Sequence, residues 1–202
     1  MQPIEVQSRP YERNGHVGRL YERLSDAELV RKATSGDARA LDVLVERHTP
    51  RVNRLAAQLL GDLEDARDAA QESLVKVCTR LRQFRGDAQF TTWLHRLVVN
   101  TCRDRMAFQR ARRTEPLLEE PMPGDDADPW RLAALADLRR DLAEALARLS
   151  PKQRAAVVLR DSFGLSYAEI SRVARIPVGT AKCYVHRARA RVKAHLEELA
   201  GV

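Results

Sequence analysis

The chain has 202 residues, enough for one large or two small domains, with 44% hydrophobic residues and a net charge of +7 that favours a polyanionic partner. It contains no apolar run of the roughly 18 residues that a membrane span needs, and its polar N-terminal residues lack the apolar stretch typical of a signal peptide. Its three cysteines lack C-x-x-C spacing, which excludes a disulfide framework and a zinc site. We therefore expect a cytoplasmic protein without metal, cofactor or membrane insertion.

Residues 1–24 have weak periodicity and contain proline and glycine, so we interpret them as a tail. Helical periodicity follows without strand alternation, which predicts an all-α fold. Capping boxes at Ser25–Glu28 and Ser166–Glu169, and the cap at Ser150-Pro151, mark helix starts. The expected helices run over 25–49, 51–60, 62–83, 91–113, 131–148, 151–162, 166–174 and 178–199.

The segment DLEDARDAAQESLVKVCTRLRQF, residues 62–84, combines an apolar stripe with an acidic and polar face. The stripe has the 3–4 spacing of a helix core, and it predicts that Cys78 is a small buried hydrophobe. The opposite face contains i,i+4 pairs such as Glu72–Lys76 and, taken alone, is an ordinary solvated surface. The stripe consists of Leu63, Ala66, Ala70, Leu74, Val77, Cys78 and Leu81.

Residues 80–113 are basic, with nine arginines and two aspartates. Gly86-Asp87 marks a loop, and Thr91 or Thr92 can cap the helix that follows. An aromatic-bearing loop beside a basic groove suits single-stranded DNA, because aromatic stacking is worth about 1–3 kcal/mol per base. Trp93 is either a stacking platform or a core residue, and the sequence leaves both interpretations open.

The stretch TEPLLEEPMPGDDADP, residues 114–129, contains four prolines and no lysine or arginine. We interpret 114–130 as an extended acidic linker between a domain at 25–113 and a domain at 131–202. About 17 residues can span roughly 50–60 Å, which exceeds one ~34 Å turn of DNA. The two domains could therefore occupy separate sites on one duplex.

The expected helices 166–174 and 178–199 are separated by Arg175-Ile176-Pro177, and Pro177 cannot extend the first helix. This pattern predicts a helix-turn-helix whose second helix enters the major groove. Eleven Lys/Arg against four Asp/Glu over 148–202 favour DNA over a merely solvated basic helix. The apolar stripe expected to pack inward is Ala181, Val185, Ala188, Val192, Leu196 and Leu199.

The segment LSPKQRAAVVLRDSFGLSYAEISRVARIPVGTAKCYVHRARARV, residues 149–192, resembles region 4 of bacterial sigma-70 family sigma factors, specifically the extracytoplasmic-function (ECF) group. Arg175 stands where that family usually has glycine, and Cys183-Tyr184 replaces its usual Ser-Arg, so the preferred −35 sequence cannot be inferred from relatives. The resemblance implies that the second helix reads the −35 promoter element through Thr180, Lys182, Cys183, His186 and Arg187.

The N-terminal half shows the same resemblance. DAAQESLVKV (68–77) is similar to sigma region 2.2, and FRGDAQFTTWLHRLVVN (84–100) is similar to regions 2.3 and 2.4. The first resemblance implies docking on core RNA polymerase through Asp65, Asp68, Gln71, Glu72 and Val75. The second implies capture of the melted −10 strand by Phe84, Gly86, Asp87, Phe90, Trp93, Arg96, Asn100 and Arg103.

These resemblances imply an ECF-type sigma factor, which is not itself an enzyme. Its expected partners are core RNA polymerase and promoter DNA, and the usual regulator in the family is an anti-sigma factor. A helix-turn-helix regulator that is not a polymerase subunit is the alternative, and it would need a ligand pocket or a phosphoacceptor domain. A nuclease would need clustered carboxylates around a metal, whereas the densest acidic cluster lies in the proline-rich linker.

Overall fold

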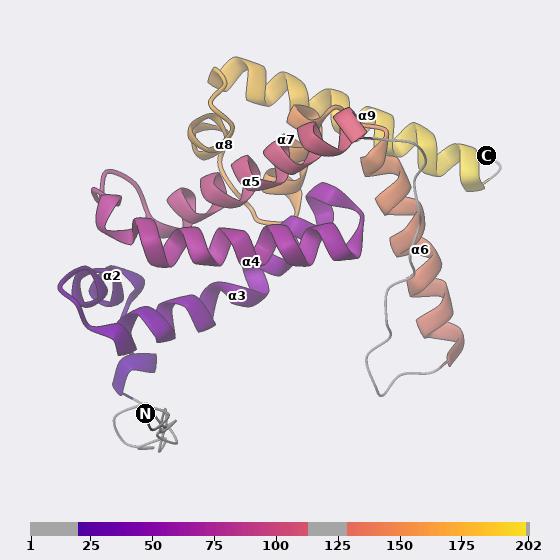
Figure 1. The fold of residues 1–202 in the computed structure, drawn as a ribbon. Helices are drawn as coiled ribbons and strands as arrows, with labels where there is room; N and C mark the ends of the chain where they lie inside the picture. Colours follow the sequence, from indigo (N-terminus) through magenta and orange to yellow (C-terminus); the bar gives the residue numbers. More distant parts are fainter. Residues whose placement is uncertain (1–19, 113–128, 201–202) are drawn as a thin grey trace. The chain divides into compact units, whose positions relative to one another are not determined.

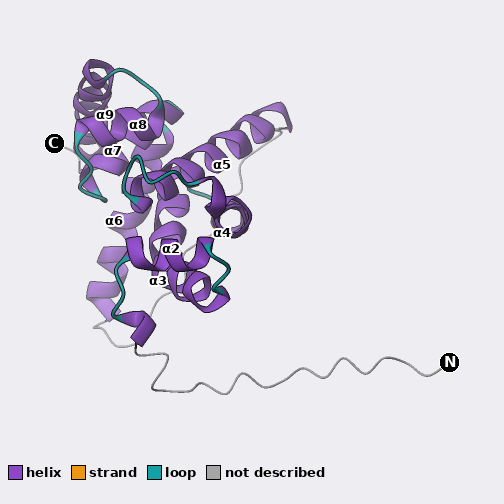
Figure 2. Ribbon diagram, turned by 90° about the vertical axis from the view of Figure 1, so that its left-hand side faces the viewer, coloured by secondary structure: helices purple, strands orange, loops and turns teal. Residues whose placement is uncertain are grey.

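The computed structural model describes residues 20–112 and 129–200, and every regular element in these ranges is a helix (Figure 1). This confirms the predicted all-α fold, and Figure 2 shows only helices joined by loops over the described part. Residues 1–19 of the expected tail and 113–128 of the expected linker lie outside the described residues. The elements are α2 (Asp26–Thr34), α3 (Ala38–Leu60), α4 (Leu63–Arg80), the 3-10 helix η1 (Leu81–Gln83), α5 (Phe90–Arg112), α6 (Pro129–Ala147), α7 (Pro151–Asp161), α8 (Tyr167–Ala174) and α9 (Val178–Ala200).

Serine side chains cap α2, α7 and α8, as the sequence predicts. Before α2, the Ser25 hydroxyl accepts from the Glu28 N–H at 3.3 Å and the Glu28 carboxylate accepts from the Ser25 N–H at 2.8 Å. The Ser166–Glu169 box repeats this arrangement before α8. Ser150 caps α7 ahead of Pro151. Each cap satisfies N–H groups that have no partner within the helix, so local sequence determines these starts.

The predicted break at Pro50 is wrong, because α3 continues through this residue. The interruption falls earlier, at Gly36, whose φ of 103° is a conformation that glycine adopts without steric cost. Asp37 then caps α3 by accepting a hydrogen bond from the Ala40 N–H at 3.1 Å. Proline removes one hydrogen bond from a helix interior, and fully buried residues such as Leu55 keep this part of α3 in place.

Helices α4 and α5 pack against each other (Figure 1). The prediction that Cys78 is buried is wrong, since its thiol is exposed. Each residue turns the helix by about 100°, and the small side chains on which α4 packs place Cys78 beyond the buried face. These buried residues of α4 are Ala66, Ala69, Ala70, Ser73 and Val77.

Neither threonine of the pair Thr91-Thr92 is the N-cap of α5. The helix begins at Phe90, and the carbonyl oxygen of Gln89 accepts from the N–H groups of Thr92 and Trp93 at 3.0 and 3.2 Å. An N-cap must precede the first helical residue. Both threonines therefore lie inside the first turn.

The C-terminal helices are built around α7, whose residues 153–159 are all buried. The predicted stripe on α9 is confirmed as far as Ala188, which has no exposed surface. Beyond it the prediction is wrong: Leu199 is 50% exposed, and His195, at 6%, points inward instead. Helices α6, α7 and α9 leave an open apolar groove of about 580 Å³ that Val192 and Leu196 line, so these two side chains have no full cover.

Candidate functional site

Two aspartates of α4 are held by one arginine of α5. The Arg105 guanidinium donates from Nε to Asp65 at 2.8 Å and from Nη2 to Asp68 at 2.5 Å. These hydrogen bonds, chiefly the one to Asp65, raise the pKa of Arg105. The Asp65 side chain is 22% exposed and that of Asp68 is 53% exposed. Asp68 therefore faces solvent, whereas Asp65 mainly joins α4 to α5.

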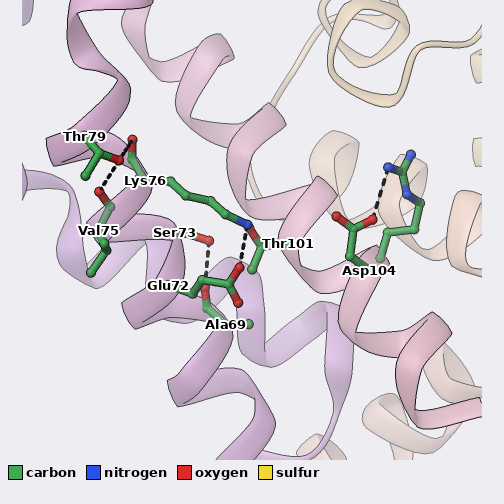
Figure 3. Close-up of polar contacts among 9 residues, drawn as sticks. Ala69, Glu72, Ser73, Val75, Lys76, Thr79, Thr101 and Asp104 are labelled. Atoms are coloured by element: carbon green, nitrogen blue, oxygen red, sulfur yellow. Dashed lines mark hydrogen bonds and ion pairs between the residues drawn. The ribbon is translucent and has the colours of Figure 1, made fainter.

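Lys76 makes a second link between the same helices (Figure 3). Its ammonium group donates to the Thr101 hydroxyl of α5 at 2.9 Å and pairs with the Glu72 carboxylate at 2.6 Å. The expected i,i+4 pair between Glu72 and Lys76 is thus present. The Glu72 side chain remains 51% exposed, so its carboxylate is still accessible from solvent.

Four of the five predicted polymerase-binding residues form one exposed surface on α4, and Asp65 is the exception. Positions 68, 71, 72 and 75 have the i, i+3, i+4, i+7 spacing of a single helix face. Gln71 is exposed, and Val75 is 56% exposed. Cys78 and Thr79 continue the same exposed surface by one turn. We call Asp68, Gln71, Glu72 and Val75 the α4 face.

Three aromatic rings cluster where the 84–89 loop meets α5. The centroid of the Phe84 ring lies 5.6 Å from Trp93 and 6.0 Å from Phe90, and the His48 ring is 5.2 Å from Phe90. Phe90 and Trp93 are only 5% and 9% exposed. The burial of Trp93 favours the core interpretation for this residue. Phe84 is half-buried, which leaves it as the aromatic ring of the cluster nearest to solvent.

The loop and the basic positions beyond the aromatic cluster are accessible to different degrees. Gly86 and Asp87 are exposed at the tip of the loop, where Gly86 has a φ of 78°. Arg96 and Asn100 are half-buried along α5, and the Arg103 side chain is 53% exposed. Their spacing of four and three residues places the last three on one side of the helix. The 84–89 loop, with its aromatic ring, is thus followed along the chain by α5, which carries the polar row of Arg96, Asn100 and Arg103 on one side.

The predicted helix-turn-helix is formed by α8, a tight turn and α9. Arg175 adopts the left-handed conformation, with φ 53° and ψ 53°, and its N–H donates to the carbonyl oxygen of Ser171. The Ile176 N–H donates to the same oxygen at 3.2 Å, and the Ser171 hydroxyl donates to the Ile176 carbonyl oxygen at 2.6 Å. These bonds fix the angle at which α9 leaves α8.

The predicted DNA-reading residues lie on the outer side of α9, opposite Ala181 and Val185, which are buried. The Lys182 ammonium group lies 5.9 Å from the centre of the Tyr167 ring of α8. A bidentate pair between Arg189 and Asp161 ties α9 to the end of α7. Lys182, His186 and Arg187 are exposed, whereas Thr180 and Cys183 are half-buried at the edge of this surface.

The described residues contain no cluster of three or more His, Cys, Asp or Glu side chains that could bind a metal ion. None of the described helices combines the length and the apolar character that crossing a bilayer requires. Cys102 is buried, and burial raises the pKa of its thiol to about 12, so it is a packing residue.

Comparison with known proteins assigns both parts of the chain. Residues 44–114 match the model of Sigma-70 region 2, and residues 139–192 match that of Sigma-70, region 4. The ECF RNA polymerase sigma factor SigM of Mycobacterium tuberculosis (strain ATCC 25618 / H37Rv) is 41% identical over 175 residues, covering 87% of this chain and 86% of SigM. The chain belongs to the ECF RNA polymerase sigma factors.

Further similarities agree with this assignment of the sigma factor. The RNA polymerase sigma-H factor of Pseudomonas aeruginosa is 31% identical over 183 residues, which cover 86% of this chain and 95% of that protein. The structure of CnrH in complex with the cytosolic domain of CnrY has a TM-score of 0.66 and 28% identity, covering 86% of this chain and 97% of that chain. RpoE from Bartonella quintana, bound to the anti-sigma factor NepR, shares the fold with a TM-score of 0.61 and 24% identity, covering 74% of this chain and 91% of that chain.

Sequence reasoning about this sigma factor missed the residues that support the α4 face from behind. Arg105 lies 40 residues from Asp65, and Thr101 lies 25 residues from Lys76. Helical periodicity relates residues within a few turns, so it carries no signal for such contacts. Arg105 lies near the buried side of α5, and a charge in such a place is usually paired. Its position in the sequence was therefore the available indication that it has an acidic partner.

Proposed function

We propose that this sigma factor binds core RNA polymerase with its α4 face and directs it to promoters through two DNA-binding surfaces. The match of region 2 and region 4 to the two parts of the chain that present exposed polar and basic surfaces supports this proposal most strongly. The α4 face combines two carboxylates, an amide and a valine, all accessible for contact with another protein. Arg105 and Lys76 hold its carboxylates in place, which reduces the entropy lost on docking.

The −10 surface of the proposal centres on the 84–89 loop. Phe90 and Trp93 are buried, so we assign them to the floor of the base-binding site and Phe84 to its exposed aromatic wall. Asn100 and Arg96 provide hydrogen-bond donors for the extruded base or its strand. Unstacking a base costs a few kcal/mol, which a site that binds only the flipped base can offset. Promoter melting then needs no hydrolysis, so we infer that the protein is an initiation factor rather than an enzyme.

The −35 surface of the proposal is the outer side of α9. Lys182, His186 and Arg187 are exposed, and Thr180 stands near the N-terminus of the helix, the part that enters the major groove first. Arginine and lysine donate to guanine O6 and N7 in that groove or to phosphates. Because polymerase and chromosomal DNA are in the cytoplasm of bacteria, we propose that the protein acts there.

An anti-sigma factor is the regulator that we propose for this chain. Of the similar solved structures, CnrH is in complex with the cytosolic domain of CnrY, and RpoE is in complex with the anti-sigma factor NepR. Because such a similar protein is bound by a partner of this kind, we expect that this chain is also controlled by a bound anti-sigma factor. Affinity purification of the tagged chain before and after cell-envelope stress tests whether a partner is released.

Run-off transcription with purified core RNA polymerase and a genomic DNA library tests the main proposal. We expect RNA synthesis from a limited set of start points only when the sigma factor is added, and the shared upstream sequences give the two promoter elements. A pull-down of core polymerase separates this function from that of an independent helix-turn-helix regulator. A chain that neither retains polymerase nor produces defined transcripts contradicts the proposal.

A further inference from the structure

Three exposed arginines lie along the chain between the α4 face and α5. Arg80 is the last residue of α4, Arg82 lies in η1, and Arg85 lies in the loop that follows. The next acidic residue along the chain is Asp87. A cation at a helix C-terminus interacts favourably with the helix dipole, which explains Arg80 but not the two arginines beyond α4. We call Arg80, Arg82 and Arg85 the arginine strip.

The arginine strip is carried by a segment whose apolar side chains pack against the protein. Leu81 is 3% exposed, and the Phe84 N–H donates to the Leu81 carbonyl oxygen at 3.0 Å. The centroid of the Phe84 ring lies 5.6 Å from that of Trp93. Residues three apart in a 3-10 helix eclipse each other, so Arg82 points away from the side that Leu81 buries. These contacts hold the backbone in place while the three arginines stay exposed to solvent.

The charge of the arginine strip is not neutralised within the protein. Other cations of α4 and α5 have carboxylate partners: Lys76 pairs with Glu72 at 2.6 Å and Arg105 pairs with Asp65 at 2.8 Å. In the described part of the chain, no ion pair involves the arginine strip. Its positive charge is therefore available to a polyanion.

We propose that the arginine strip binds the phosphates of the unpaired DNA strand beside the captured base. This inference rests on the proposed function, because Phe84, on the same short segment, is the exposed aromatic wall of the proposed base-binding site. A stacking ring flanked by cations binds single strands largely without sequence preference. Phosphate contacts position the strand, whereas Asn100 and Arg96 are assigned to the base or its strand. Arg80 and Arg82 lie between Phe84 and the α4 face along the chain, so the bound strand passes the end of this face.

Fluorescence anisotropy with labelled single-stranded dT12 and the full chain, at about 50 to 200 mM salt, tests the arginine strip. Each phosphate contact on a single strand contributes about 0.7 to the slope of log affinity against log salt concentration. The triple variant Arg80→Gln, Arg82→Gln, Arg85→Gln should therefore have a slope shallower by about 2, so its affinity gap to wild type narrows roughly 20-fold over this range. Lysine at all three positions keeps the charge and should keep the wild-type slope.

A second triple variant is the matched control for net charge. Arg31→Gln, Arg139→Gln and Arg148→Gln remove the same charge at exposed positions elsewhere and should leave the slope unchanged. Circular dichroism confirms that each variant folds. The same titrations on the dT12·dA12 duplex identify the source of the phosphates, because an equal change of slope there overturns the assignment to the unpaired strand. A glutamine variant that keeps the wild-type slope on dT12 but no longer co-purifies with core polymerase shows that the arginine strip meets polymerase instead.

Phe84→Ala separates this inference from the proposed function. Loss of the ring should weaken dT12 binding roughly 5–100-fold without changing the slope. A shallower slope for the glutamine variant of the arginine strip, with wild-type affinity for Phe84→Ala, supports the arginine strip and counts against base capture. An unchanged slope, with weaker binding by Phe84→Ala, refutes the arginine strip and leaves base capture standing. A wild-type chain that does not bind dT12 contradicts both.

Discussion

At the scale of single residues, Arg175 occupies a backbone conformation that its side chain disfavours. In the left-handed region Cβ crowds the following carbonyl oxygen, at a cost of about 1–2 kcal/mol for a residue other than glycine. The φ of 53° at Arg175 lies in this region. The hydrogen bonds that Ser171 makes across the turn hold the conformation regardless of the residue at its centre.

Replacing Arg175 by glycine should therefore stabilise the protein. We expect Arg175→Gly to raise the free energy of unfolding by about 0.5–1 kcal/mol, less than the full strain because glycine also loses more backbone entropy on folding. Arg172→Gly, one turn earlier in right-handed helix, is the matched control and should lower it by about 1 kcal/mol. Urea denaturation measures both, and a loss of stability in both variants contradicts the prediction.

His95 should make folding sensitive to mild acid. Its side chain is buried, and burial, followed by repulsion from Arg51, lowers its pKa from 6.5 to about 4. The unfolded chain binds a proton at His95 below pH 6.5 while the folded chain does not, so stability falls as pH drops from 6.5 towards 4. We expect this group to contribute a loss of roughly 2–3 kcal/mol.

Denaturation curves between pH 7.5 and 4.5 measure this effect. His95→Gln should reduce the pH dependence in that window, because the residue that gains a proton on unfolding is gone. Asn53→Ala, at an exposed asparagine of α3, changes no titratable group and should leave the pH dependence as in wild type. Equal slopes for wild type and His95→Gln would show that the buried imidazole does not control this transition.

At the scale of elements, α4 exposes one polar face to solvent, and side chains of α5 hydrogen-bond to α4 and hold this face in place. Charge reversal at Asp68 and Glu72 should abolish core polymerase binding, because both carboxylates are exposed on the α4 face. A double reversal at Asp104 and Asp137, with side chains 67% and 61% exposed, changes the net charge equally and should preserve binding. Co-purification with core polymerase gives the readout, and circular dichroism confirms that both variants fold. Retained binding in the Asp68/Glu72 variant would refute the assignment.

Helix α9 allows a comparable test on DNA. Because Lys182 and Arg187 are exposed on its outer side, replacing both by alanine should weaken −35-dependent transcription. Loss that depends on the −35 sequence, at about 1–3 kcal/mol per base contact, indicates base reading. Uniform loss across promoter variants, with a shallower salt dependence, indicates phosphate contacts instead. Ala190→Ser on an exposed part of the same helix is the control for a change without charge.

The elements show what sequence patterns can and cannot predict. Capping boxes are local, so Ser25 and Ser166 located helix starts correctly. The break at Pro50 was predicted from a local penalty that the packing of α3 outweighs. Burial of Cys78 and Leu199 was predicted from an apolar stripe, but burial depends on which neighbouring helix covers the stripe. The bond from Arg154 to Leu59 joins residues 95 apart and has no local pattern at all.

At the scale of the whole molecule, we propose that one chain binds DNA both as a paired duplex and as an unpaired strand. The region 4 part offers a helix suited to paired DNA, and the region 2 part offers a loop and a polar row suited to an unpaired strand. The second surface matters only once the duplex opens. Variants of the two parts should therefore affect different steps of initiation.

Asn100→Ala should impair open-complex formation more than closed-complex binding. The Asn100 amide is half-buried on α5 and is proposed to bind the extruded base, which is absent from the closed complex. Permanganate reactivity of unpaired thymines measures opening, and footprinting at low temperature measures closed binding. Asn53→Ala, at an exposed asparagine of α3, should affect neither step. Equal loss of both steps in Asn100→Ala would argue against base capture.

The exposed thiol of Cys78 has a practical consequence. Cys102 is buried and Cys183 is half-buried, so Cys183→Ser, which restores the serine usual in the family, leaves one reactive cysteine. A maleimide dye would then attach one turn from Val75, beside the surface proposed to meet polymerase. Its emission reports assembly and release of the holoenzyme in real time, without an added tag.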